Sequence, residues 1–274
     1  MFSSLMQNIT QTKGIVLLSG GSSGFGASAS SLFAKKGYKV YALSRRGTAP
    51  ADPLIIPRKA DINDEEAVSQ AVKEIVEKEG RIDILVCNAG NGIAGSIEDI
   101  SIEDSRKQFE TCYWGSLRLI REVLPHMRKQ KSGRIITVAS VAAVIPLPFQ
   151  AHYSAVKSAL LSMTEALSLE VKPFGIQCCS ILPGDAKTGF TSERKTFGED
   201  GAYSATLKKS VEKMAHDEQT GMSPERIAKA IVKEATSRRM SPTVTPGLQY
   251  KAINLLYRLL PRRFALWIIG LLYA

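Results

Sequence analysis

The chain has 274 residues, a formal net charge of +10, 44% hydrophobic residues and 23% charged residues. This length allows one large α/β domain or two small ones, and the composition excludes a fibrous, disordered or multi-pass membrane protein. The four cysteines have no CxxC spacing and the three histidines lie far apart in the sequence. We therefore expect a reducing compartment, no disulfide scaffold and no metal site.

The positive charge is concentrated near the C-terminus. Residues 225–274 hold nine Lys or Arg and only two acidic residues, interleaved with Leu, Ile, Trp and Tyr. No nucleic-acid-binding motif accompanies them, so we expect no nucleic-acid partner. Residues 1–13 have neither a basic n-region nor a sustained apolar run. We therefore expect no secretory signal and a cytoplasmic protein.

Strands and helices alternate along the chain. A buried, β-branched run predicts the first strand at residues 15–19. Further strands are predicted at 39–43, 54–56, 83–87, 134–139 and 176–182, and helices at 27–36, 64–79, 102–130 (one long or two abutting), 152–171 and 223–239. Asp64 is placed to cap its helix. The alternation predicts an α/β protein with a doubly wound parallel sheet, the Rossmann fold.

No repeat or linker divides the chain, so we expect one domain. It spans residues 14–246, after an N-terminal extension of residues 1–13 and before a basic and apolar C-terminal extension of residues 247–274. Residues 188–222, approximately, are polar and helix-prone. They follow the last core strand and are predicted to form a substrate lid.

A glycine-rich turn follows the first strand directly. Its candidate phosphate-binding residues are Gly20, Ser22, Ser23, Gly24, Phe25 and Gly26. Glycines there let a pyrophosphate approach the first amides of the next helix. A glycine-rich turn of this kind also occurs where a strand simply connects to a helix. It is therefore evidence for a phosphate-binding site only together with the strand before it and the helix after it.

The second strand ends in Ser44-Arg45-Arg46 rather than in an acidic residue. A carboxylate at this place would repel a ribose 2′-phosphate, whereas guanidinium groups bind phosphate well. We therefore predict NADP(H) as the cofactor, with Arg45 as the main contact. Both arginines have the alternative of being solvated surface charges.

Three further features carry the chemistry. Asn88, Ala89 and Gly90 follow one strand, Ser140 follows the next, and Tyr153 and Lys157 stand four residues apart on a helix. That spacing places phenol and ammonium on one helix face, although alone it fits a surface pair. A charge about 4 Å away is worth about 4 kcal/mol, or roughly three pKa units, so Lys157 is predicted to bring the pKa of Tyr153 near neutrality. His152 points to another helix face and is expected to be structural or at the rim of the site.

In this order, these motifs resemble the short-chain dehydrogenase/reductase family, from Gly14 to Thr188 and more loosely to Arg239. The stretches IDILVCNAGNGIAGSIED and EALSLEVKPFGI resemble its NADPH-preferring branch of hydroxysteroid dehydrogenases, retinoid reductases and acyl-dihydroxyacetone-phosphate reductases. The resemblance implies Ser140, Tyr153 and Lys157 as catalytic residues and a homo-oligomer. It also implies cofactor contacts from the glycine-rich turn, Arg45, Asp61, Ile62, Asn88, Ala89, Gly90, Tyr153, Lys157, Pro183, Gly184 and Thr188.

One position departs from the family pattern. Cys112 stands where the family has the Asn that completes a proton relay. A thiol lacks the donor and acceptor pair of an amide. The leading hypothesis is an NADPH-dependent reductase of a lipophilic carbonyl compound, acting by hydride transfer with Tyr153 as the acid. The alternative is a weak or inactive NADP(H)-binding regulatory protein.

Two apolar segments bear on the substrate. Residues 141–149 either line the pocket or pack in the interior or at a subunit interface. The last uncharged run, 264–274, is too short to span a membrane, which takes about 20 residues. Residues 248–274 are predicted to touch lipid or the mouth of a lipid-binding site, as an interfacial anchor on anionic headgroups, or else to pack on this chain or a second copy.

Overall fold

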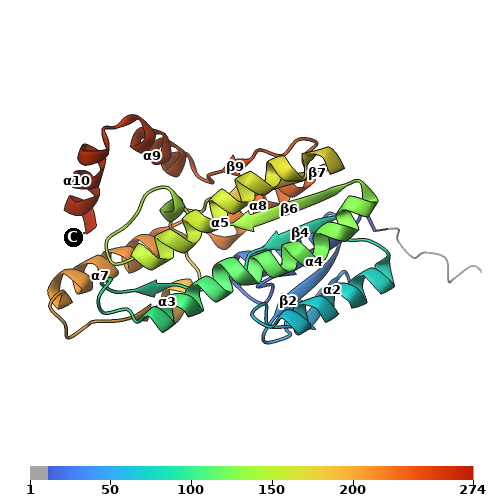
Figure 1. Ribbon diagram of the computed structural model, residues 1–274, viewed down its shortest axis with the longest axis horizontal. Coiled ribbons are helices and arrows are strands. Elements are labelled where there is room, and N and C mark those ends of the chain that lie inside the picture. The colour runs from blue at the N-terminus through green and yellow to red at the C-terminus, as the bar shows by residue number, and fades with distance from the viewer. Residues whose placement is uncertain (1–11, 274) are drawn as a thin grey trace, which may run out of the picture.

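The computed structural model describes residues 12–273, and the structure is built on a seven-stranded parallel sheet (Figure 1). The strand order is β3-β2-β1-β4-β6-β7-β9, and β5 and β8 form a separate pair. The strands are β1 Ile15–Ser19, β2 Lys39–Ser44, β3 Ile55–Lys59, β4 Ile84–Cys87, β5 Ile93–Ala94, β6 Gly133–Val138, β7 Ile176–Ile181, β8 Lys195–Thr196 and β9 Thr243–Val244. The order reverses between β1 and β4, as in a doubly wound sheet, so the predicted Rossmann fold is confirmed.

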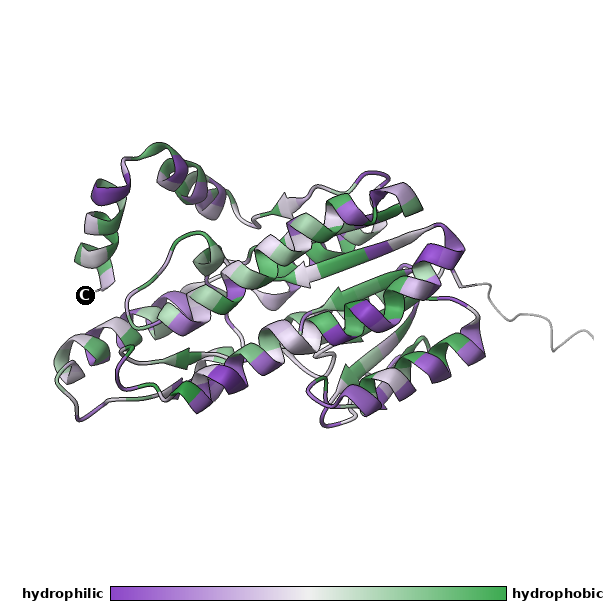
Figure 2. Ribbon diagram, viewed as in Figure 1, coloured by the Kyte–Doolittle hydropathy of each residue, from purple (hydrophilic) through white to green (hydrophobic). Residues whose placement is uncertain are grey.

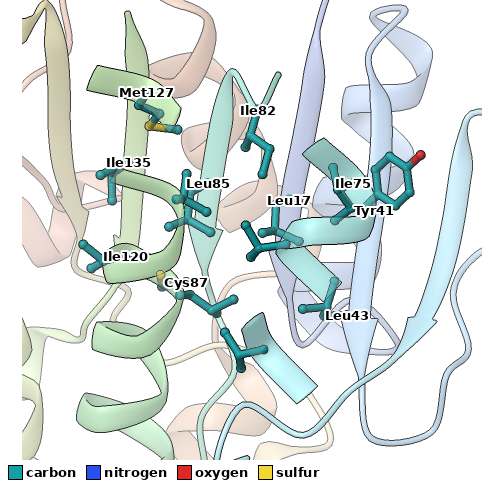
Figure 3. Packing of buried hydrophobic residues seen from close by; sticks show 14 of the residues in the cluster. Leu17, Tyr41, Leu43, Ile75, Ile82, Leu85, Cys87, Ile120, Met127 and Ile135 are labelled. Carbon is teal, nitrogen blue, oxygen red and sulfur yellow. The ribbon is translucent and has the colours of Figure 1, made fainter. Parts of the chain in front are cut away.

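Helices cover both faces of the sheet. The α-helices are α1 Gly24–Lys35, α2 Glu65–Glu79, α3 Ile102–Phe109, α4 Gly115–Gln130, α5 Ala151–Glu170, α6 Phe190–Glu193, α7 Ser204–Thr220, α8 Pro224–Thr236, α9 Leu248–Leu259 and α10 Arg262–Tyr273. Helices α1 and α8 pack on one face. Helices α2, α4 and α5 pack on the other, where Leu17, Leu85 and Ile135 of the strands meet Ile75 and Ile120 (Figure 3).

The helix and strand boundaries differ from the predicted ones at a few places. Helix α1 begins at Gly24 inside the glycine-rich turn, and β3 is shifted to Ile55–Lys59. Asp64 does cap α2, since its carboxylate accepts from the Ala67 amide at 3.0 Å. The region predicted as one or two helices at 102–130 is α3 and α4 joined by a π-helical turn, Glu110–Trp114. Strand β9 was not expected, because two residues are too few to show the alternation of apolar and polar side chains that predicts a strand.

The C-terminal helices α9 and α10 form a bent arm that stands away from the sheet and returns to α7, where Tyr273 contacts Asp217 (Figure 1). Tyr257, Ala265 and Ile269 pack there against Ile145 from the loop after β6. Within residues 12–273, no helix is both long and apolar enough to cross a membrane. The predicted N-terminal extension lies almost wholly outside the described residues.

Candidate active site

A single cavity of about 1510 Å³ opens at the carboxyl edge of the sheet and reaches from the glycine-rich turn to α9 and α10. It brings together nearly every residue that the sequence nominated. Its lining includes Gly20, Ser22, Ser23, Gly24, Phe25, Arg45, Asp61, Ile62, Asn88, Ala89, Gly90, Ser140, Tyr153, Lys157, Pro183, Gly184 and Thr188. Gly26 is the exception, because it lies behind the turn and supports it.

The turn between β1 and α1 requires its glycines. Gly20 and Gly24 have φ of 72° and 54°, in the left-handed region that side chains rarely adopt. A Cβ at Gly26 would lie 2.1 Å from the Gly20 carbonyl oxygen, so any side chain there would push the turn apart. The backbone is thus shaped as a close-fitting cradle at the start of a helix, which suits a pyrophosphate.

The Asn88-Ala89-Gly90 turn is tied directly to this cradle. The Asn88 side-chain amide donates to the carbonyl oxygens of Ser19 at 3.1 Å and Gly20 at 3.3 Å. The Ser19 hydroxyl accepts from the backbone amides of Asn88 and Ala89. The ends of β1 and β4 are therefore held together, and Asn88 serves mainly to fix the shape of the cradle.

The arginines after β2 both line the cavity. Arg46 donates to the hydroxyls of Ser22 at 3.0 Å and Ser23 at 3.2 Å. Arg45 makes no such contact with the glycine-rich turn and is exposed. The sequence prediction put Arg45 first, whereas in the structure Arg46 is the arginine that contacts the glycine-rich turn.

Ser140, Tyr153 and Lys157 meet at the centre of the cavity. The Ser140 hydroxyl accepts from the Ala142 amide at 3.1 Å and faces the Tyr153 phenol closely enough to lower its pKa. Lys157 is buried, its ammonium donates to the Val138 carbonyl oxygen at 2.9 Å, and it lies 5.7 Å from the centre of the Tyr153 ring. This set can hydrogen-bond a carbonyl oxygen and deliver a proton to it.

The predicted near-neutral pKa of Tyr153 is wrong in this structure. Burial raises the pKa above its ordinary value, while the Lys157 charge and the Ser140 hydrogen bond act to lower it. The sequence argument counted the charge alone, as though it lay about 4 Å away, and omitted the cost of burying a phenolate.

Cys112 lies behind this centre on the π-helical turn. Its thiol is 3.5 Å from the Asn91 side-chain oxygen, and its carbonyl oxygen accepts from the Ser116 hydroxyl at 3.1 Å. A Cβ built on Gly90 would be 3.4 Å from the thiol sulfur and 3.6 Å from the Lys157 nitrogen. Cys112 thus lies near Lys157, at the position where the family pattern has Asn, but it lacks the donor and acceptor of an amide side chain.

Several lining residues were not foreseen from the sequence. The Phe190 ring of α6 lies 5.8 Å from the Tyr153 ring, so the predicted lid does reach the site. Asp185 accepts from the Tyr250 hydroxyl at 2.8 Å, and Asp217 on α7 accepts from the Tyr273 hydroxyl at 3.1 Å. Burial raises the pKa of Asp185, and burial together with Asp185 raises that of Tyr250 to about 12.

The outer part of the cavity is apolar. Its wall is formed by Val141, Ile145 and Leu147 together with Ile253, Leu256, Tyr257, Leu260, Ala265, Ile268, Ile269 and Leu272 of the C-terminal helices. The two alternatives for residues 141–149 therefore both hold, because Ile145 lines the cavity and also packs against α10. His152 does not line the cavity, and its Nδ1 lies 2.9 Å from the Ser105 hydroxyl.

Comparison with known proteins agrees with this geometry. The family model described as short chain dehydrogenase matches residues 14–199, and the chain belongs to the short-chain dehydrogenase/reductase family of oxidoreductases, which act on carbonyl and alcohol groups. The chain is 36% identical to a 3-ketodihydrosphingosine reductase of Bacteroides thetaiotaomicron over 80% of this chain and 82% of that protein. It is 30% identical to a 3-dehydrosphinganine reductase of Danio rerio over 84% and 71%.

Solved structures show the same fold, and two of the three described here hold nicotinamide cofactors. A short-chain dehydrogenase from Streptomyces avermitilis superposes with a TM-score of 0.83, at 26% identity, over 92% of this chain and 94% of that one. ElxO with NADP bound has a TM-score of 0.74 at 25% identity, over 88% and 100%. A 3-ketoacyl-(acyl-carrier-protein) reductase from Brucella melitensis, complexed with NADH, has a TM-score of 0.72 at 25% identity, over 86% and 98%.

Proposed function

We propose that this protein is an NADPH-dependent reductase that converts the ketone of a long-chain lipid into an alcohol. The observation that carries the proposal is the position of Ser140, Tyr153 and Lys157, which lie in one cavity between a dinucleotide cradle and an apolar wall. The cradle fits a nicotinamide dinucleotide, because the left-handed backbone at Gly20 and Gly24 forms a cavity-lining turn at the start of a helix. When bound, that cofactor supplies the hydride.

The protein's own residues handle the carbonyl oxygen and the proton. Ser140 donates a hydrogen bond to the carbonyl oxygen, and Tyr153 transfers its phenolic proton there as negative charge develops. Lys157 stabilises the phenolate that remains, because its ammonium is held by the Val138 carbonyl oxygen and lies 5.7 Å from the centre of the Tyr153 ring. Phe190 covers the Tyr153 ring and helps to exclude water.

The preference for NADPH rests on charge. Arg45 and Arg46 both face the cavity at the end of β2, where no acidic residue follows the strand. Arg46 already bridges the two serines of the cradle, so its guanidinium is held at the phosphate-binding turn. A 2′-phosphate would bind to a fork of this kind through charge-assisted hydrogen bonds.

Asp185 and the relatives together favour a long-chain amino ketone as the substrate. Two relatives are named for reduction of 3-ketodihydrosphingosine, which carries an ammonium group beside its ketone and a long alkyl chain. Asp185 is a half-buried carboxylate in the cavity whose hydrogen-bond donor is the Tyr250 hydroxyl. A cationic substrate group would compensate its charge, and the alkyl chain would lie along the C-terminal helices.

The test is NADPH oxidation by the purified protein with 3-ketodihydrosphingosine, a ketosteroid, retinal and acyl-dihydroxyacetone phosphate. We expect turnover to be fastest with the amino ketone and to disappear in Tyr153→Phe, which should still bind NADPH. NADPH binding without turnover of any of these compounds would instead favour the alternative function, that of a nucleotide-binding regulatory protein with a weakened relay at Cys112.

We also propose that the protein works in the cytoplasm as a homo-oligomer. All four cysteines are buried free thiols, which suits a reducing compartment. Trp114 and Leu169 are exposed beside an apolar hollow between α4 and α5, a surface that a second copy would cover. Sedimentation of the wild type and of Leu169→Glu would measure this association.

A further inference from the structure

The outer surface of α9 and α10 is strongly apolar. Exposed side chains there are Leu248, Leu255, Leu259, Phe264, Leu266, Trp267 and Leu271, and none of them lines the cavity. Phe264 and Trp267 stack on one another with ring centres 5.6 Å apart. Figure 2 shows how much of this arm is apolar, away from the body of the protein. So large an apolar surface at the end of a chain is characteristic of an interaction site.

The same surface is basic throughout. Lys251, Arg258, Arg262 and Arg263 occur between Gly247 and Ala274, and no acidic residue does. All four are exposed, and Arg262 also lies over the Tyr257 ring at 5.0 Å. Cationic groups among exposed leucines and a tryptophan match the interface of an anionic bilayer. They argue against a second copy of the same face, which would bring like charges together.

The inner side of the arm joins this surface to the substrate cavity. Ile253, Leu256 and Leu272 line the cavity and are also about half exposed, at 47%, 55% and 51%. They form the rim of its mouth. Each helix has 12 residues, against the ~20 needed to span a bilayer, so the arm can lie on a membrane but not cross it.

We propose that α9 and α10 seat the protein on an anionic lipid surface, with the cavity mouth facing the lipid. Leu255, Leu259, Trp267 and Leu271 enter the interface, while Arg258 and Arg263 pair with headgroup phosphates. An alkyl chain can then pass from the bilayer to the apolar cavity wall without crossing water. Binding of the arm to a membrane does not depend on the proposed function. Only the delivery of a lipid substrate to the cavity rests on that function.

The experiment is flotation of the full-length protein with vesicles of phosphatidylcholine alone or with added phosphatidylglycerol. We expect binding to the anionic vesicles that weakens at high salt. The variant Trp267→Glu/Leu271→Glu should lose it, and Arg258→Gln/Arg263→Gln should weaken it by about tenfold or more. Matched controls are Ile102→Glu, an exposed isoleucine on α3, and Lys35→Gln/Lys36→Gln, two exposed lysines at the end of α1. Both controls should bind as the wild type does.

Two further measurements separate a loss of membrane binding from a loss of folding or of activity. Circular dichroism checks that each variant is folded, and reduction of a short water-soluble ketone should be unchanged, because Trp267 and Leu271 lie outside the cavity. Failure of the wild type to float, or equal flotation of all variants, would overturn the proposal. So would an oligomer that dissociates in Trp267→Glu/Leu271→Glu without any vesicle binding, since the face would then be a subunit interface. Loss of ketone reduction with intact flotation would count against the proposed function alone.

Discussion

At Tyr153 two electrostatic effects oppose one another. Burial disfavours the phenolate, and the nearby ammonium of Lys157 and the hydroxyl of Ser140 favour it. Burial is the larger effect, so the folded protein holds the phenol protonated to higher pH than in water. The phenol is therefore in the protonated form that a proton donor needs, although its raised pKa makes it a weaker acid.

The sign of this shift predicts the pH dependence of ketone reduction. Because the pKa of Tyr153 is raised above 10, the acid form persists below it and is lost only as the pH rises through it. We expect kcat/KM for reduction to show no fall due to Tyr153 between about pH 6 and about pH 9. A decrease in kcat/KM with a midpoint near neutrality that moves to higher pH in Lys157→Met would contradict this. It would support the near-neutral pKa of Tyr153 that the sequence argument predicted from the Lys157 charge alone.

Cys112 gives the second prediction at this scale. An amide at this position would offer a donor and an acceptor next to Asn91 and Lys157, where the thiol offers weak ones. We expect Cys112→Asn to raise kcat by about tenfold, the effect of a hydrogen bond worth about 1.4 kcal/mol, and to leave NADPH affinity unchanged. Steady-state kinetics of Cys112→Asn beside Cys112→Ser, which adds no amide, would test it. A lower kcat in the asparagine variant would show that the thiol is not a weakened relay.

Asp185 gives a prediction about substrate charge. Asp185→Asn keeps an acceptor for the Tyr250 hydroxyl but removes the negative charge from the cavity. Because a hydrogen bond to a charged group contributes about 1.5–3 kcal/mol, kcat/KM for an amino ketone should fall tenfold or more. A neutral ketone of the same chain length serves as the control and should be reduced at least as well. Equal losses for both ketones would mean that Asp185 is structural.

At the level of elements, the turn after β1 and the loop after β2 act as one unit. Arg46 joins them through Ser22 and Ser23, and Arg45 stands next to it. We expect NADPH to bind at least tenfold more tightly than NADH, from a phosphate contact of about 1.5–3 kcal/mol. Titration of both nucleotides against Arg45→Ala and Arg46→Ala would show which arginine carries the preference. NADH affinity is the internal control, and equal affinities in the wild type would refute the prediction.

The sequence predicted those elements whose signals are local. The buried run before Gly20, the capping carboxylate of Asp64 and the i, i+4 spacing of Tyr153 and Lys157 each depend on a few neighbouring residues. Strand β9 has two residues and forms only because β7 offers a free edge, and the π-helical turn around Cys112 depends on packing. The pairing of Asp185 with Tyr250 was equally out of reach, since the two residues are 65 positions apart.

On the scale of the whole molecule, the sheet and the C-terminal arm contribute different parts of one cavity. The sheet edge supplies the cradle and the candidate catalytic residues, and the arm supplies the apolar wall and the mouth. The arm is held at both ends. Tyr250 packs in the core against Gly184, where a Cβ would lie 2.2 Å from its ring, and Tyr273 bonds to Asp217 of α7. If the proposed function is right, binding of a long-chain substrate will depend on contacts that the Rossmann core alone does not make.

This division predicts how activity depends on chain length. Burial of a methylene group is worth about 0.8 kcal/mol, so kcat/KM should rise by about threefold to fourfold for each methylene that reaches the apolar wall. Ile268 lines that wall at a distance in sequence from every catalytic residue. In Ile268→Gln the gain in kcat/KM for each added methylene should be smaller for the longer ketones, while the shortest ketone keeps its wild-type rate. A homologous series of ketones measured with both proteins would decide the matter, and parallel length profiles would mean that the alkyl chain lies elsewhere.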